Sequence, residues 1–224
     1  MKCDSHATHQ GSLIGAADQA LYAAKDAGRN AWRFFAPEMN EHLSQRMFIE
    51  MGLRRALQNG ELFLQYQPQV DTRSGRLVGA EALLRWDSVA LGPVPPTEFI
   101  AVAEETGLIK PIGAWVLEQA CLAWVGWQAL AGNDTGHPLH RLQLSVNISA
   151  SQLADPELVP FLQALIARSG MSAQCLELEI TESQLMDNAV AAQAQMAALK
   201  ALGVLLSIDD FGTGYSSLDR KSVV

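Results

Sequence analysis

Five side chains with oxygen donors could together bind divalent cations, namely Glu81, Asn147, Glu179, Asp209 and Asp210. Each lies at or near the end of a short segment with the alternation of a β-strand. Carboxylate and amide oxygens are hard ligands that favour Mg²⁺ or Mn²⁺ over zinc. Two such ions about 4 Å apart are a common device for hydrolysing phosphate esters. These residue types therefore point to metal-dependent phosphoester hydrolysis, with solvated strand ends or helix caps as the alternative.

The strands that would carry these ligands have one polar and one apolar face. In the predicted strand 142–148, Ser145 and Asn147 alternate with leucine, valine and isoleucine. In 175–180, Glu177 and Glu179 share a face and repel each other unless a cation neutralises them. A strand of an open parallel sheet covered by helices is usually apolar on both faces. The polar face instead suits a barrel whose strands point polar groups at a site.

The order of elements predicts a mixed α/β fold. Strands are expected at 61–67, 77–86, 142–148, 175–180 and 204–208. Helices are expected from about Asn40 to Asn59, at 97–105, 112–130 and 189–202, and from Asp155–Pro156 to Gly170. Upstream, 17–27 reads as a helix and 31–35 as a short strand. Alternation of strands and helices predicts a parallel sheet, either a barrel or a doubly wound sheet. In a barrel, the ligands would share one rim.

Composition limits the function classes. The chain is 49% hydrophobic and 18% charged, as in globular proteins, and its formal net charge is −8. An acidic surface disfavours non-specific binding of nucleic acid, so cations would have to bring the positive charge for a phosphate ligand. Three scattered cysteines fit a reducing cytoplasm. The apolar segment 112–130 has helical spacing, which indicates a buried helix and not a membrane span.

Six motifs occur in an order that resembles the EAL domain family. They are Leu64–Pro68, Glu81–Trp86, Phe99–Gly107, Ser145–Ser149, Glu179–Glu182 and Asp209–Ser217. The second of them begins Glu81-Ala82-Leu83, the triplet that names the family. The resemblance covers about residues 41–218, and it implies a TIM-like barrel.

The resemblance also implies an activity and roles for individual residues. Family members use two divalent cations, Mg²⁺ or Mn²⁺, to cut one phosphodiester of cyclic di-GMP and release linear pGpG. Glu81, Asp209 and Asp210 would be catalytic. The implied metal ligands are Glu81, Asn147, Glu179, Asp209 and Asp210, with Asp209 shared by both ions. Gln67 and Arg85 would contact the nucleotide, Arg85 at a phosphate. Glu182 would hold the loop 209–217 in position.

The expected domain organisation follows from the same comparison. Residues 1–36 are expected to be the C-terminal remnant of a GGDEF domain, because Ala17–Asn30 looks like the last helix of that family. Residues 37–40 would be a linker and 41–218 the N-terminal two-thirds of an EAL domain, with about five barrel strands. Residues 219–224 are unlike the family and are expected to be a non-native tail. The parent protein would carry GGDEF and sensor domains upstream, which could anchor it to a membrane, and an EAL homodimer is one expected assembly.

Three functions are compatible with the sequence. The first is a cyclic di-GMP phosphodiesterase in the parent protein, of which this chain would be an inactive piece. The second is a non-catalytic module that binds cyclic di-GMP or docks a partner. The filled ligand positions favour the first. The third is a chain that folds poorly by itself, because an open barrel exposes strand edges and core.

Overall fold

The computed structural model describes residues 38–181 and 189–209, with the isolated positions 17, 20, 21, 32, 34 and 36. The chain divides into two compact units, Met1–Gly52 and Leu53–Val224. The expected GGDEF remnant lies largely outside the described residues, and the expected tail 219–224 lies wholly outside them. Residues 38–40, which were expected in a linker, form the start of helix α2 (Glu38–Asn59).

Thirteen elements are described in chain order. They are α2 (Glu38–Asn59), β1 (Leu62–Val70), β2 (Leu77–Ser88), β3 (Gly92–Val94), α3 (Pro96–Thr106), α4 (Ile109–Ala131), β4 (Gln143–Asn147), α5 (Ala150–Leu153), α6 (Leu158–Ser169), the 3₁₀ turn η1 (Ala173–Cys175), β5 (Leu176–Thr181), α8 (Ala189–Leu202) and β6 (Leu205–Asp209). All five strands predicted between 61 and 208 are present. The short elements β3, α5 and η1 were not predicted, since three or four residues show no usable periodicity.

The strands form one sheet in the order β1-β2-β4-β5-β6, with β3 beside β2. Pairing is parallel from β2 through β4 and β5 to β6, as the alternation of strands and helices predicted. The first pair, β1 and β2, is antiparallel. A tight turn makes this pairing: the Asp71 side chain accepts hydrogen bonds from Ser74 N and Ser74 Oγ, both at 2.7 Å, and Gly75 takes a φ of +68°.

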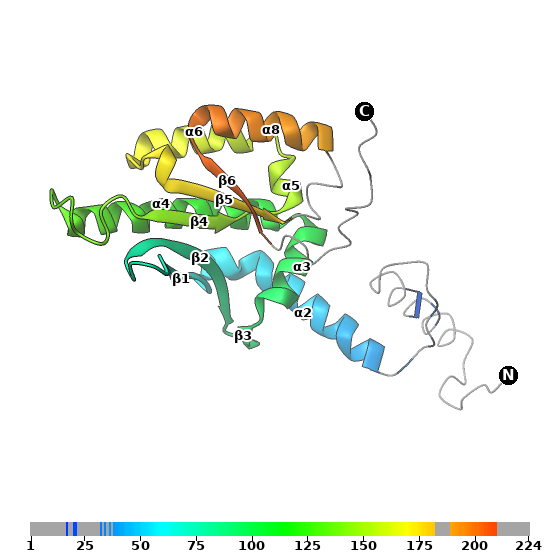
Figure 1. Cartoon of the computed structure of the whole chain (residues 1–224). Helices are drawn as coiled ribbons and strands as arrows, with labels where there is room; N and C mark the ends of the chain where they lie inside the picture. The colour runs from blue at the N-terminus through cyan, green and yellow to red at the C-terminus, as the bar shows by residue number, and fades with distance from the viewer. Residues whose placement is uncertain are drawn as a thin grey trace. The chain divides into compact units, whose positions relative to one another are not determined.

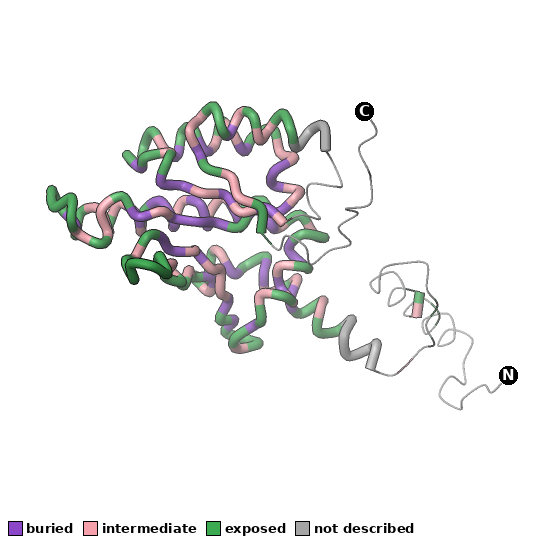
Figure 2. The backbone as a smooth tube through the Cα atoms, viewed as in Figure 1, coloured by how far each residue is buried: buried purple, intermediate pink, exposed green. Residues whose placement is uncertain are grey.

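Helices α4, α6 and α8 run alongside the parallel strands (Figure 1). The apolar faces of β4 and β5 pack under them, and Leu144, Leu176 and Leu178 have no exposed surface. Buried positions concentrate in this layer (Figure 2). The Trp124 indole Nε1 donates to Leu142 O at 2.8 Å, which fastens α4 to the start of β4. None of the described helices is long and apolar enough to cross a membrane.

One predicted helix start was wrong. Asp155 and Pro156 precede α6, whose N-cap is Glu157. The Asp155 carboxylate accepts from Glu157 N at 3.1 Å and forms an ion pair with Lys110 Nζ at 2.8 Å. Asp155 therefore closes a turn and links it to α4, and the helix begins after that turn.

The buried thiols offer a test of this core. Cys121 on α4 has no exposed surface, and burial raises its pKa to about 11. A thiol is reactive as its thiolate, so we expect Cys121 to resist alkylation at pH 8. In a Cys3→Ser variant, maleimide should label neither Cys121 nor the buried Cys175 until denaturant is added. Mass spectrometry identifies the labelled cysteine. Rapid labelling of Cys121 in the native chain would show that α4 does not pack as described.

Candidate active site

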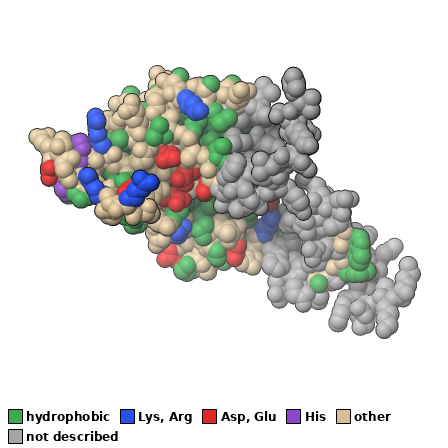
Figure 3. Space-filling view, viewed as in Figure 1, with side chains coloured by type: hydrophobic (Ala, Val, Ile, Leu, Met, Phe, Trp, Pro, Cys, Tyr) green, Lys and Arg blue, Asp and Glu red, His purple; other side chains and the backbone are tan. Residues whose placement is uncertain are grey.

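One face of the sheet is lined with polar side chains from four parallel strands. The parallel register pairs Glu81 with Ser145, Asn147 with Glu179, and Thr181 with Asp209. Since residues two apart on a strand share a face, these side chains belong to a single surface. Several Asp and Glu side chains gather in a patch near the middle of the visible face of the molecule (Figure 3). The predicted polar face is therefore continuous across β2, β4, β5 and β6.

A direct contact joins the carboxyl end of β4 to the middle of β2. Asn147 Nδ2 donates a hydrogen bond to Glu81 Oε1 at 2.7 Å, although the two residues are 66 positions apart in sequence. Asn147 ends β4 and is exposed, while Glu81 is half-buried. The amide therefore compensates part of the Glu81 charge. To serve as a metal ligand, Asn147 has to present its oxygen in place of this nitrogen.

Glu179 lies in an environment that disfavours its charge. Burial, together with the nearby carboxylates of Glu81, Asp209 and Glu177, raises the Glu179 pKa to about 7. The fully buried Ser145 hydroxyl opposes the shift by hydrogen bonding, and it also donates to Glu177 Oε2 at 3.4 Å. Glu81, Glu177, Glu179 and Asp209 thus form a carboxylate cluster whose members raise the pKa of Glu179 by repulsion.

The position of Glu81 differs from the prediction. It was expected at or near a strand end, but it is the fifth of the twelve residues of β2. The parallel ladder with β4 covers only Gly79–Ala82, and β2 then continues to pair with β3 at Trp86–Ser88. Glu81 is therefore close to the end of the parallel ladder, although it is not at the end of the strand. In this ladder Glu81 pairs with Ser145, two residues before Asn147 at the end of β4.

The expected nucleotide-binding residues flank this cluster on the same face. Gln67 on β1 pairs with Glu81 in the antiparallel register. Arg85 lies four residues beyond Glu81, and its Nε donates to Gln65 Oε1 at 2.9 Å while its Nη1 donates to Leu84 O at 2.9 Å. Gln65 thereby fixes the Arg85 guanidinium on a strand whose alternate residues, Glu81 and Arg85 among them, share a face. Sequence reasoning assigned no role to Gln65.

A pocket of about 270 Å³ opens next to the cluster. It is lined by Arg85 and Asn147 from the strands and by residues of α3, α4 and α5. Glu104 of α3 is among them, and burial raises the pKa of its carboxyl. Glu104 belongs to the motif Phe99–Gly107, but its type alone gave no signal that it would reach this pocket. The pocket offers a ligand the Arg85 guanidinium and the polar side chains of Glu104 and Asn147.

The EAL domain family matches residues 51–223. The chain belongs to the EAL family. It is similar to the bifunctional diguanylate cyclase/cyclic di-GMP phosphodiesterase MucR of Pseudomonas aeruginosa, with 41% identity over 215 residues, 96% of this chain and 30% of MucR. It is also similar to the cyclic di-GMP phosphodiesterase PdeR of Escherichia coli, with 37% identity over 215 residues, 96% of this chain and 31% of PdeR. The chain thus spans less than a third of either relative.

Solved EAL structures share the fold. The complex of the MucR phosphodiesterase with cyclic di-GMP aligns with a TM-score of 0.67 and 40% identity, over 76% of this chain and 66% of that one. The strands β1, β2, β4, β5 and β6 are thus part of a TIM-like barrel of the EAL type, which confirms the predicted fold class.

The ligand set expected for an EAL domain is only partly described. Asp210 and Glu182 lie outside the described residues. Among the residues that are described, no group of three or more His, Cys, Asp or Glu could hold a metal ion. Asn147 adds an amide to the carboxylates on this face. The all-oxygen donor set and the raised pKa of Glu179 nevertheless suit a hard cation, because a divalent ion would relieve the carboxylate repulsion.

Proposed function

We propose that this EAL domain hydrolyses cyclic di-GMP to linear pGpG in the protein that carries it. The position of Asn147 carries this proposal. Asn147 contacts Glu81 and pairs with Glu179 in the register of β4 and β5, so three oxygen-bearing side chains from three strands lie on one face. The names of the relatives MucR and PdeR support the substrate.

The site residues divide into two proposed groups. Glu81, Asn147, Glu179, Asp209 and Asp210 would hold two Mg²⁺ or Mn²⁺ ions, with Glu81, Asp209 and Asp210 closest to the chemistry. Bound ions would neutralise the phosphate and lower the pKa of an attacking water. Arg85 would bind a phosphate oxygen, since Gln65 holds its guanidinium in place. Gln67 would contact the nucleotide from β1, and Glu182 would steady the loop that follows Asp209.

The wider context is part of the same proposal. GGDEF and sensor domains upstream would control the activity, and two EAL domains would associate as a homodimer. The domain would work in the cytoplasm, where the buried thiols of Cys121 and Cys175 stay reduced.

Metal dependence tests the function directly. The protein made from the complete reading frame should convert cyclic di-GMP to pGpG with Mg²⁺ or Mn²⁺. Chromatography of the reaction mixture measures the pGpG formed. Excess chelator should stop turnover, and added Mn²⁺ should restore it. Full activity in chelator would exclude the two-metal site. Binding of cyclic di-GMP without turnover in the presence of Mn²⁺ would instead favour the second function, a non-catalytic receptor.

A further inference from the structure

The turn that follows Asn147 is held by a reciprocal pair of side chains. Ser149 is the N-cap of α5, and its Oγ accepts from Gln152 N at 3.3 Å. The Gln152 side chain returns the contact, because its Oε1 accepts from Ser149 N at 3.1 Å and from Ser149 Oγ at 3.0 Å. Both residues are 6% exposed. This capping box fixes the backbone two residues after Asn147.

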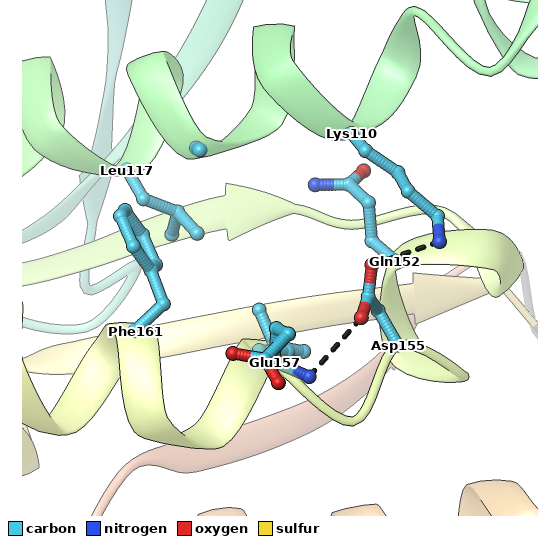
Figure 4. A pocket seen from close by; sticks show the side chains of 8 residues that line it. Lys110, Leu117, Gln152, Asp155, Glu157 and Phe161 are labelled. Atoms are coloured by element: carbon cyan, nitrogen blue, oxygen red, sulfur yellow. Dashed lines mark hydrogen bonds and ion pairs between the residues drawn. The ribbon is translucent and has the colours of Figure 1, made fainter.

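Gln152 also fits against helix α4 at a glycine. A Cβ built on Gly113 would lie 1.8 Å from Gln152 Nε2 and 2.6 Å from Gln152 Cδ. The Gln152 amide therefore occupies the space that any larger residue at position 113 would need. Figure 4 shows the Gln152 side chain pointing toward α4. Glycine is unfavourable inside a helix, so its presence in α4 fits a requirement for this close approach.

The same turn is connected to the carboxylate cluster. Ile148 N donates to Glu179 O at 3.0 Å, which ties the residue after Asn147 to β5. Gln152 lines the 270 Å³ pocket together with Arg85 and Asn147. It also lines a second pocket of about 160 Å³ on the side of Lys110 and Phe161. Gln152 thus lines both the pocket that contains Asn147 and the pocket that contains Lys110 and Phe161.

We propose that Gln152, seated on Gly113, is a positioning residue that holds Asn147 beside Glu81 for cation binding. This inference rests on the proposed function, because it assigns Asn147 to the metal site. Gln152 itself would touch neither the metal nor the substrate. Loss of a partner that orients a metal ligand typically costs about 10–100-fold in metal affinity. The Gln152 contacts should have an effect of that order.

The affinity for Mn²⁺ tests the inference. It is measured by calorimetric titration, without substrate, of the protein made from the complete reading frame. Gln152→Ala should weaken Mn²⁺ binding about tenfold or more. Gln152→Glu keeps an acceptor for Ser149 N and should bind Mn²⁺ more tightly than Gln152→Ala. A matched control is Leu162→Ala in the core of α6, where Leu162 has no exposed surface. This variant should lower the unfolding midpoint without changing the Mn²⁺ affinity of the folded protein.

A double-mutant cycle tests the seat on Gly113 without any metal. Gly113→Ala should lower the unfolding midpoint when Gln152 is present, because the added Cβ meets the amide. Combined with Gln152→Ala, the same change should cost nothing further, since the clash is gone. If the two substitutions lowered the unfolding midpoint additively, the close contact between Gln152 and Gly113 would be refuted. Unchanged Mn²⁺ affinity in folded Gln152→Ala would overturn the positioning role alone, whereas a wild-type protein that binds no Mn²⁺ would overturn the proposed function as well.

Discussion

Replacing Glu81 with alanine should abolish the hydrolysis of cyclic di-GMP and leave the protein folded. Glu81 is half-buried on the polar face, and its carboxylate receives the Asn147 amide at 2.7 Å. Its removal would take away a proposed metal ligand that none of the surrounding described side chains replaces. The loss of turnover should exceed the roughly 10–100-fold that an outer-sphere partner contributes. Formation of pGpG in Mn²⁺ at saturating substrate measures the effect.

The matched control for this substitution is Glu157→Ala. Glu157 is an exposed carboxylate at the N-cap of α6, so the change removes the same charge away from the polar face. It should keep wild-type turnover and melting. If Glu81→Ala retained more than about a tenth of the activity at full Mn²⁺ occupancy, Glu81 would have no place among the ligands.

Glu179→Gln should stabilise the metal-free protein at pH 8 while weakening its affinity for Mn²⁺. The carboxylates of Glu81, Asp209 and Glu177 repel the Glu179 charge, and the substitution removes this repulsion. Sites built for function often cost stability in this way. A gain of about 1 kcal/mol would raise the unfolding midpoint by roughly 2–4 °C in a chain of this size. Differential scanning calorimetry in chelator measures the shift.

The gain should depend on pH in a defined direction. The folded state raises the Glu179 pKa from 4.5 to about 7, so the folded protein holds this proton more tightly than the unfolded chain. The wild-type protein should therefore lose stability as pH rises through this range, and Glu179→Gln should not. At pH 5 the two proteins should melt alike. Adding Mn²⁺ at pH 8 should stabilise the wild type more than the variant. An equal gain at pH 5 and pH 8 would show that charge repulsion is not the cause.

The polar side chains of the site could be predicted from alternation alone. Because side chains alternate between faces, Ser145 with Asn147 and Glu177 with Glu179 had to share a face of their strands. The motifs then related these strands to one family, and the family match bears this out. Metal binding by these residues stays a prediction, and so do the roles of Asp210 and Glu182 beyond the described part of the chain.

Contacts between distant residues required the tertiary structure. The sequence predicted which strands exist, since hydrophobic periodicity is local. It did not predict that β2 pairs with β4 over only Gly79–Ala82, a register that sets Glu81 beside Ser145 and within reach of the Asn147 amide. Nor did it predict that the Gln152 amide fills the space beside Gly113, because residue type does not reveal which helix a side chain will meet. Local patterns determined the elements and the polarity of their faces, whereas register and close packing, which depend on the whole chain, decided which side chains meet.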